Sequence, residues 1–258
     1  QGNEHVINAR FADANFFVRE DVKKKLEDFR PELSGLTFQT KLGSMLDKSN
    51  RMLKLGAELC PLFGFTTTET IKPLGRAVYL AKTDLVTQMV TEMTSLQGII
   101  GREYALRSGE DEVVATAIGE QYQTVPQSKI GMALALTDRL DSLVGLFAAG
   151  LAPTGTKDPF ALRRAAIGVV SPILEHGLNF DLRVAIDETA KLQPVDVSDE
   201  TKAKVLEFIV GRLRVVLRER GYAHDAVDAV LADQAQNPAC AAKAVEQLST
   251  WVARDDWE

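Results

Sequence analysis

The chain of 258 residues is 45% hydrophobic and 26% charged, the ordinary balance of a soluble globular protein. Its net charge of −6 at neutral pH argues against a nucleic-acid binder held mainly by bulk positive charge, although local basic patches are compatible with it. The absence of any run of about 18 apolar residues argues against a transmembrane helix, and the three histidines and two cysteines argue against a Cys/His zinc site.

Apolar residues recur with the helical period along nearly the whole chain, and the alternating pattern of β-strands is almost absent. The sequence therefore predicts an all-α fold. The first predicted helix, over 6–19, has one apolar side formed by Phe11, Ala14, Phe17 and Val18. Further helices are predicted, in chain order, over 38–62, as one or two helices over 69–93, as short pieces within 94–112, from 112 through 118, and over 130–150, 160–175, 182–192, 199–220, 223–234 and 239–252.

Local features indicate how these helices are organised. Pro194 is the best candidate for a boundary between two helical units. Residues 1–5 match neither an initiator methionine nor a signal peptide, so we expect a processed chain or a piece of a longer one. Cys60 and Cys240 lie in apolar surroundings and are expected to be buried free thiols.

The segment 155–168 combines a loop, broken by glycine and proline, with a helix that carries two adjacent arginines. Asp158 is predicted to be the N-cap of this helix, and Pro159 to lie in its first turn, where a missing N–H costs nothing. Arg163 and Arg164 are expected at the edge of the helix or outside it, where a polyanion, a carboxylate or solvent alone could surround them. The side expected to face the core consists of Phe160, Ala161, Ile167 and Val170.

Several collinear blocks of the sequence resemble one family. The blocks are 10–14 (RFADA) with Phe16 and Phe17, 38–44 (FQTKLGS), 96–105 (LQGIIGREYA) and 157–164 (KDPFALRR). They are similar to the β subunit of bacterial-type heterotetrameric glycyl-tRNA synthetase, and the similarity extends over most of the chain.

This resemblance implies a division of labour between two kinds of subunit. In that family a separate α subunit makes glycyl-adenylate, and the larger β subunit supplies tRNA binding that aminoacylation needs. The resemblance implies an HD-like helical domain over 1–193 and the first helices of a helical, DALR-like anticodon-binding domain over 194–258. The implied partners are glycine tRNA and the α subunit, in an α2β2 assembly, and neither a membrane nor DNA. No cofactor is expected in this chain, since ATP and Mg²⁺ belong to the α subunit, and the expected location is the bacterial cytoplasm or a plastid.

The HD-like part raises the question of phosphohydrolase activity. HD-type hydrolases bind a divalent metal through a His, a His-Asp pair and a distal Asp, and the metal activates water. In this chain Thr83 stands where the His of the pair is expected, Asp84 and Asp138 are retained, and no histidine stands at the place of the first one. We therefore expect a decayed site with no catalytic residue and no metal, whose aspartates bond to the backbone or pair with Lys82 or Arg139.

Basic residues are the expected tRNA contacts, because a guanidinium can donate two parallel hydrogen bonds to a phosphate. Phe16, Phe17 and Tyr104 could stack on bases, with core packing as the alternative for the phenylalanines. The basic candidates are Arg102, Arg107, Lys157, Arg163, Arg164, Arg212, Arg214, Arg218 and Arg220.

A plain solvated surface, or ion pairs within the chain, is the alternative to RNA for these cations. Arg102 stands beside Glu103, and Arg218 and Arg220 flank Glu219. Exposed pairs contribute only about 0–1 kcal/mol and need no function.

Two other functions compete with tRNA recognition. An HD-type metal-dependent phosphohydrolase is disfavoured by the missing histidines, and the dipeptide His224-Asp225 is expected to open a helix without a catalytic role. An inter-subunit scaffold is the other rival. In that case Arg163 or Arg164 would clamp two helical domains by reaching a carboxylate such as Asp138 or Asp141.

Overall fold

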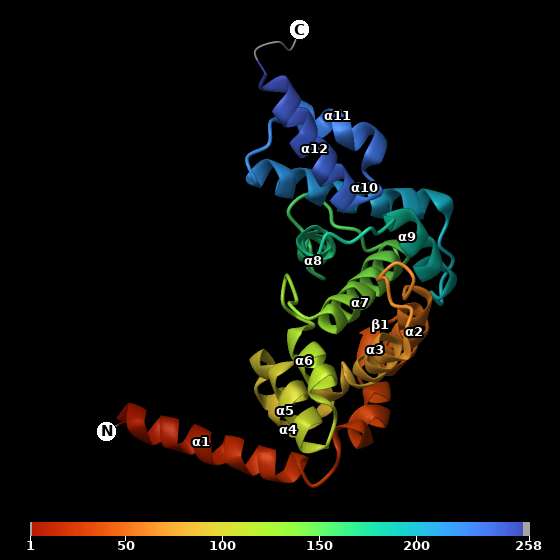
Figure 1. The fold of residues 1–258 in the computed structure, drawn as a ribbon. Coiled ribbons are helices and arrows are strands. Elements are labelled where there is room, and N and C mark those ends of the chain that lie inside the picture. The colour runs from red at the N-terminus through yellow and green to blue at the C-terminus, as the bar shows by residue number, and fades with distance from the viewer. Residues whose placement is uncertain (1, 255–258) are drawn as a thin grey trace.

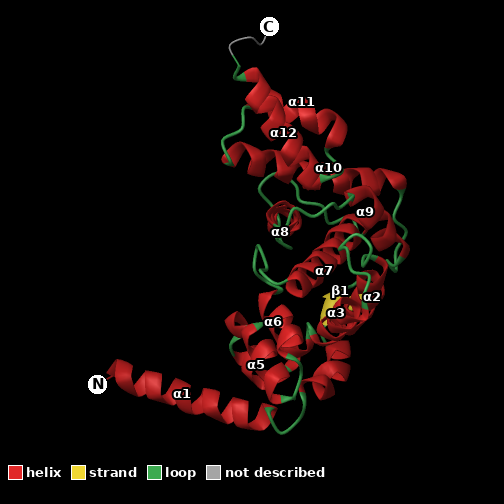
Figure 2. Ribbon diagram, viewed as in Figure 1, coloured by secondary structure: helices red, strands yellow, loops and turns green. Residues whose placement is uncertain are grey.

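The computed structural model describes residues 2–254, with side chains from residue 10 onward, and it is built almost entirely of helices (Figure 2). The predicted all-α class is confirmed, with a two-stranded hairpin as an addition in this part of the chain. Within the same residues no helix is both long and apolar enough to cross a membrane. The elements are α1 (Gly2–Asp21), the 3-10 helix η1 (Leu26–Gly35), β1 (Thr37–Gln39), β2 (Gly43–Ser44), α2 (Met45–Glu58), α3 (Thr68–Leu80), η2 (Thr83–Val86), α4 (Gln88–Glu92), η3 (Thr94–Leu96), α5 (Ile99–Arg107), α6 (Glu112–Glu120), α7 (Lys129–Ala148), α8 (Leu162–Glu175), α9 (Leu182–Lys191), α10 (Asp199–Glu219), α11 (His224–Gln234) and α12 (Pro238–Val252).

The segment 37–44 forms an antiparallel hairpin, whereas the sequence pattern predicted that a helix begins at residue 38. Gly43 has a φ of +87°, a left-handed conformation that a continuous helix does not contain. Ser44 then caps α2, because its hydroxyl accepts from the N–H of Asp47 while the Asp47 carboxylate accepts from the N–H of Ser44. The predicted helix over 38–62 is therefore correct over 45–58 and wrong before residue 45 and after residue 58, where turns follow.

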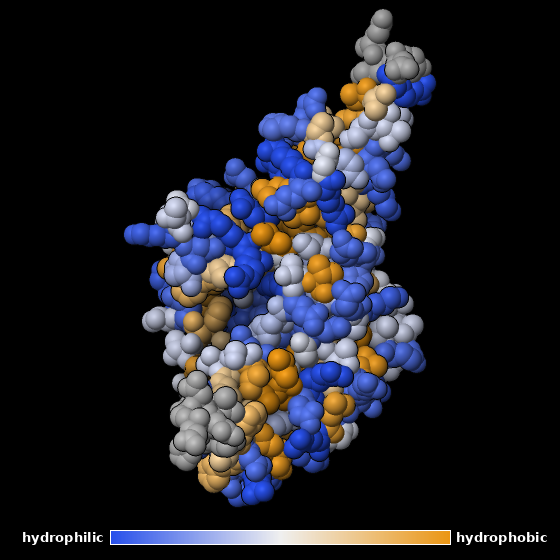
Figure 3. All heavy atoms as spheres, turned by 90° about the vertical axis from the view of Figure 1, so that its left-hand side faces the viewer, coloured by the Kyte–Doolittle hydropathy of each residue, from blue (hydrophilic) through white to orange (hydrophobic). Residues whose placement is uncertain are grey.

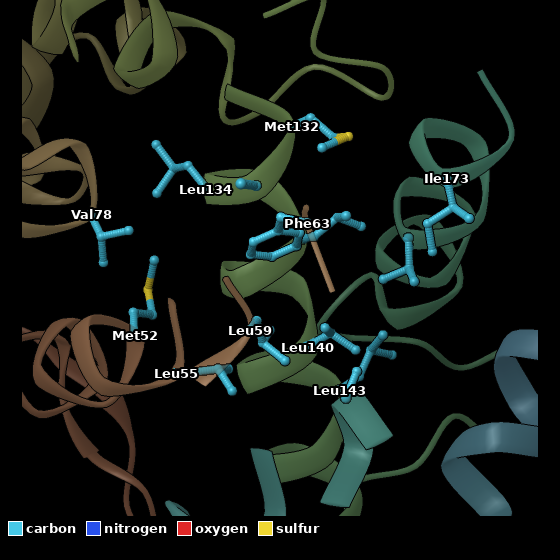
Figure 4. Packing of buried hydrophobic residues seen from close by; sticks show 14 of the residues in the cluster. Met52, Leu55, Leu59, Phe63, Val78, Met132, Leu134, Leu140, Leu143 and Ile173 are labelled. Carbon is cyan, nitrogen blue, oxygen red and sulfur yellow. The ribbon is translucent and has the colours of Figure 1, made fainter. Parts of the chain in front are cut away.

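α7 forms the centre of the molecule, and most of its residues are buried. α2, α3, α6, α8, α9 and α10 all pack against it. Figure 4 shows side chains of α7, including Leu134, Leu140 and Leu143, facing apolar side chains of α2, α3 and α8, with Phe63 among them. Full burial of each such side chain contributes about 1.5–3 kcal/mol, so this continuous core fixes the positions of the surrounding helices.

The molecule is elongated, with α1 projecting from one end and α11 and α12 at the other (Figure 1). α1 packs on α4, and α10 lies across α7, α8 and α9. α11 and α12 pack on each other, α11 also on α10 and α12 also on α8. Pro194 lies in the link between α9 and α10. The predicted division into two domains falls in this link and stays a prediction.

The two cysteines lie in different environments. Cys60 is buried and hydrogen-bonds to the carbonyl of Gly56 at 3.2 Å, and burial raises the pKa of its thiol. Cys240 is exposed, because the buried side of α12 runs through Ala241 and Val245 and turns position 240 outward. Both thiols are free, but the prediction that both are buried is wrong for Cys240.

Candidate functional site

Residues 154–163 form a turn that fixes the start of α8. Thr154 and Lys157 exchange two backbone hydrogen bonds, of 3.1 and 2.9 Å. The carboxylate of Asp158 accepts from the N–H groups of Leu162 and Arg163, at 2.8 and 2.9 Å. Asp158 thus satisfies the first amides of the helix as an N-cap does, but from outside the N-cap position. Its carboxylate occupies the site where an anion would otherwise meet the helix N-terminus.

α8 begins at Leu162, so the prediction that Pro159 lies in its first turn is wrong. Ala161 interrupts the helical backbone with φ 52° and ψ 37°, a left-handed conformation that costs an alanine about 1–2 kcal/mol. Phe160 and Ala161 are exposed and do not face the core, while Val170 is buried and Ile167 is half-buried.

The two arginines of this segment have different roles. Arg163 donates to the carbonyl of Gly155 at 2.5 Å and lies 3.8 Å from the Asp158 carboxylate, so it ties the turn together. It does not reach Asp138 or Asp141, which corrects the predicted clamp. Arg164 is exposed, and its side chain makes no hydrogen bond or ion pair with any described residue.

Lys157 and Arg102, like Arg164, are exposed cations. Lys157 is exposed at the tip of the turn, and Arg102 is exposed on α5, with its stem against Gly119 of α6. The side chain of neither residue makes a hydrogen bond or an ion pair with another residue in the described range. Glu103 binds Arg107 at 2.8 Å, so of the two alternatives to RNA for Arg102 the structure shows a solvated side chain and not an ion pair with Glu103. We call Arg102, Lys157 and Arg164 the free cations.

Two arginines of α10, Arg214 and Arg218, form ion pairs with the following helix, α11. The Asp228 carboxylate accepts from Arg214 at 2.7 Å and from Arg218 at 3.3 Å, and it lies 2.8 Å from Nδ1 of His224. The hydrogen bond from Arg214 is the largest influence that lowers the pKa of Asp228. Arg218 is therefore ion-paired, as the alternative to RNA expected, but its partner is Asp228 and not Glu219.

Two further arginines of α10 also have partners. Arg220 binds Glu175 at 2.7 Å, and the guanidinium of Arg212 lies 5.8 Å from the ring centre of Phe208.

A surface groove of about 790 Å³ lies between α9 and the link to α10 and is lined by residues such as Asp187. None of the candidate cations lines this groove.

The aromatic candidates differ in exposure. Phe16 is 57% exposed, whereas Phe17 packs against the core and Tyr104 is buried, with its hydroxyl donating to Asp21 at 3.0 Å. Phe11 is 71% exposed, so the predicted apolar side of α1 meets the core at Ala14, Phe17 and Val18 but not at Phe11. Figure 3 shows apolar patches at the α1 end of a largely hydrophilic face.

The retained aspartates lie in a buried ionic centre between α2, η2 and α7. The Asp138 carboxylate binds Lys82 at 2.7 Å and Lys48 at 3.0 Å. Lys48 also binds Asp141 at 2.9 Å, and Arg51 donates to Asp141 at 2.8 Å. The prediction that Lys82 pairs with a retained aspartate is confirmed.

Asp84 differs from its neighbours in the centre, because its main partner is the backbone. Its carboxylate accepts from the N–H of Gly98 at 2.6 Å, as the sequence analysis allowed. Burial raises the pKa of Asp84 to about 6, against the opposing influence of the Gly98 N–H and the charge of Lys82. Arg139, the other predicted partner, donates instead to the carbonyls of Gly168 and Gln123, so that prediction is wrong.

The donor set of this centre does not fit a divalent metal. Each oxygen of Asp138 already binds a lysine ammonium group. Thr83 stands in place of an imidazole, and its hydroxyl is buried without a hydrogen-bond partner. Among residues 2–254 there is no group of three or more His, Cys, Asp or Glu that could hold a metal ion. The oxygens through which Asp138 would bind a metal are thus already bound to lysine ammonium groups.

The sequence analysis did not identify Lys48 and Arg51 as members of the centre. Both lie on the side of α2 that also carries Met52 and Leu55, which are buried in the core. A charged residue in an apolar helical stripe requires a buried partner, and that pattern could have indicated them.

Comparisons with known proteins agree on one group. The family model described as glycyl-tRNA synthetase beta subunit matches residues 1–232. The chain is 43% identical over 246 residues to the glycine–tRNA ligase beta subunit of Pectobacterium atrosepticum, covering 92% of this chain and 35% of that protein. It is 38% identical over 265 residues to the beta subunit of Clostridioides difficile, covering 99% and 38%. It is 41% identical over 250 residues to the chloroplastic/mitochondrial glycine–tRNA ligase 2 of Arabidopsis thaliana, covering 94% and 23%. The chain thus spans between 23% and 38% of the length of these relatives.

Proposed function

Because this chain belongs to the glycyl-tRNA synthetase beta subunit family, we propose that it is a tRNA-recognition region of the beta subunit of glycine–tRNA ligase. In this proposal it supports the ATP-dependent glycylation of glycine tRNA, with the α subunit of an α2β2 assembly as its protein partner. The chemistry of amino-acid activation, with ATP and Mg²⁺, belongs to the α subunit. The chain itself contributes binding and no catalytic group.

The observation that carries the proposal is the set of free cations. Arg102, Lys157 and Arg164 are exposed and uncommitted, while the other arginine candidates already have partners in the chain. A phosphate that binds a free cation breaks no existing ion pair, so the full charge attraction is available to RNA. The net charge of −6 makes such local contacts the main source of affinity.

The turn at 154–163 gives two of the free cations a defined position. Asp158 and Arg163 hold the turn through the helix amides and the carbonyl of Gly155. Lys157 and Arg164 therefore bind RNA without first paying the entropy of ordering the backbone that carries them.

The domain assignment is part of the same proposal. Residues 1–193 are the HD-like domain, and residues 194–258 are the opening of the anticodon-binding domain. The relatives are bacterial proteins and a plant protein named as chloroplastic/mitochondrial, which supports a bacterial cytoplasmic or a plastid location.

Binding of labelled glycine tRNA to a doubly substituted chain tests the proposal. Lys157→Glu together with Arg164→Glu should weaken binding roughly tenfold at about 0.1 M salt and lower the slope of log K against log salt by about 2. The matched control is Lys54→Glu together with Lys72→Glu, because these exposed lysines of α2 and α3 are equally free of partners and the change in net charge is identical. Equal weakening in the two variants would show that only net charge matters and would contradict the proposal.

The scaffold function is the alternative, and the exposed side chains of Phe11 and Phe16 favour it, since large exposed aromatics mark interaction surfaces. The same pair of substitutions distinguishes the two functions. If the variant keeps its tRNA affinity but no longer assembles with the α subunit, the turn is a docking element between proteins.

A further inference from the structure

The buried ionic centre is balanced in charge. Its cationic members are Lys48, Arg51 and Lys82, and its anionic members are Asp84, Asp138 and Asp141, three of each sign. Lys82 is 4% exposed and Lys48 is 3% exposed, so solvent screens neither of them. Buried charges are stable only when they are paired and hydrogen-bonded, and here each sign neutralises the other.

The ammonium groups of the two lysines lie against the carboxylate oxygens that would otherwise be available to a metal cation. Oδ1 of Asp138 lies 3.0 Å from Nζ of Lys48, and Oδ2 lies 2.7 Å from Nζ of Lys82. Both oxygens of Asp141 are likewise used, Oδ1 by Arg51 and Oδ2 by Lys48. A metal ion needs several carboxylate or carbonyl oxygens at once, and these oxygens already accept hydrogen bonds.

Lys82 is held in place from a second direction. Its Nζ lies 4.5 Å from the ring centre of Tyr122 and 3.3 Å from the hydroxyl of that residue. Its charge also acts on the Asp84 carboxylate, which has one oxygen without a hydrogen-bond partner. The ammonium group of Lys82 therefore binds Asp138 directly, and its charge also acts on Asp84.

We propose that the ammonium groups of Lys82 and Lys48 are built-in replacements for a divalent cation, so that this helical centre is neutralised by the chain itself and is closed to metal ions. A divalent ion added to the balanced centre would leave two uncompensated positive charges in the interior. The centre is a structural joint between α2, η2 and α7 and takes no part in the proposed binding of tRNA.

Lys82→Met tests the proposal, because methionine keeps much of the side-chain length and removes the charge. We expect the melting temperature to fall on the order of 10 °C, since removal of one partner leaves Asp138 buried with less compensation. We also expect millimolar Mn²⁺ or Mg²⁺ to recover part of this loss, and equilibrium dialysis to show Mn²⁺ bound to the variant. The wild-type chain should melt at the same temperature with Mn²⁺, with Mg²⁺ and with EDTA.

Two further variants keep the test decisive. Lys82→Met combined with Asp138→Asn removes both charges, and it should melt above the single variant and show no response to metal. Lys54→Met is the surface control for the same change of side chain and should leave the melting temperature unchanged within about 2 °C.

Three results would overturn the proposal. The first is a wild-type chain that binds Mn²⁺ stoichiometrically or is stabilised by it. The second is a Lys82→Met variant that is as stable as wild type. The third is a destabilised Lys82→Met variant whose stability does not change with Mn²⁺ or Mg²⁺ while the double variant is no more stable than the single one.

Discussion

Asp84 is fully buried and Asp138 is half-buried, and their surroundings shift the pKa values of the two acids in opposite directions. Burial is the largest influence on each and favours the neutral carboxyl group. At Asp138 the charges of Lys48 and Lys82 together outweigh burial and hold the pKa well below its usual range. At Asp84 the Gly98 N–H and the charge of Lys82 do not outweigh it, and the pKa is about 6. The two acids therefore affect stability with opposite dependence on pH.

Asp84→Asn isolates this effect. The pKa of Asp84 is raised in the folded chain, so Asp84 destabilises the fold at neutral pH, where both folded and unfolded chains are ionised, and this destabilisation disappears as the pH falls through about 6 toward 4. We expect the variant to be more stable than wild type near pH 7, by up to about 3 kcal/mol, and about equal near pH 4. Urea unfolding of both chains across this range measures the difference. A difference that is constant with pH would contradict the prediction.

The sequence indicates single residues of the buried ionic centre, but it does not show which residues come together to form it. Lys82 was predicted because it lies two positions from Asp84 in the same segment. Lys48 and Arg51 lie about 90 positions before Asp141, and only the packing of α2 on α7 brings them together. For the same reason the sequence could not separate the free cations from the paired ones.

At the scale of elements, helices with a long apolar period were predictable and short local structures were not. The hairpin at 37–44 is too short to show the alternating apolar pattern of a strand. The positive φ of Gly43, which prevents a helix there, cannot be inferred from the spacing of apolar residues. The start of α8 was placed too early because Asp158 and Pro159 are both typical of a helix start. The left-handed backbone of Ala161, held by hydrogen bonds on either side, delays the helix to Leu162.

Asp158→Ala tests the contribution of the turn to RNA binding. The loss of two hydrogen bonds to helix amides should cost about 1–2 kcal/mol of stability and release the turn that carries Lys157 and leads into the first residues of α8, including Arg164. We expect weaker binding of glycine tRNA, by about three- to tenfold, even though the substitution removes a negative charge.

The matched control for that variant is Asp181→Ala, which removes the N-cap of α9. It makes the same change of side chain and of net charge, and a similar loss of stability is expected. If Asp158→Ala and Asp181→Ala have equal tRNA affinity at a temperature where both are folded, the turn makes no contribution to binding.

At the scale of the whole molecule, one apolar core continues from α7 across the predicted domain boundary into α10. Leu213 of α10 is fully buried in the same cluster as Leu140 of α7. The sequence predicted the helices on both sides of Pro194, but apolar patterns do not reveal which helix packs on which. The chain's membership in its family was predictable, because it rests on linear blocks of sequence.

Leu213→Ala tests whether the stability of α7 and α8 depends on the packing of α10 in the shared core. The cavity should lower stability by about 2–5 kcal/mol and increase amide hydrogen exchange in α7 and α8 as well as in α10. Val215→Ala on the same helix is the control, since Val215 is partly exposed and its truncation should cost much less. Faster exchange confined to α10, α11 and α12 would mean that residues 194–258 unfold as an independent unit.

The hydrogen bonds described for the turn and for the ionic centre span very different lengths of chain, and this affects the order of folding. Those of the turn join residues no more than eight positions apart, whereas Lys48 and Asp141 are 93 positions apart. Closing a loop of about ten residues takes about 10–100 ns, and the entropy of closure grows with loop length. We therefore expect the turn to form at the outset of folding, and the charges of the centre to stay hydrated until α2 meets α7. The chain then completes the exposed turn that carries Lys157 before its buried ion pairs.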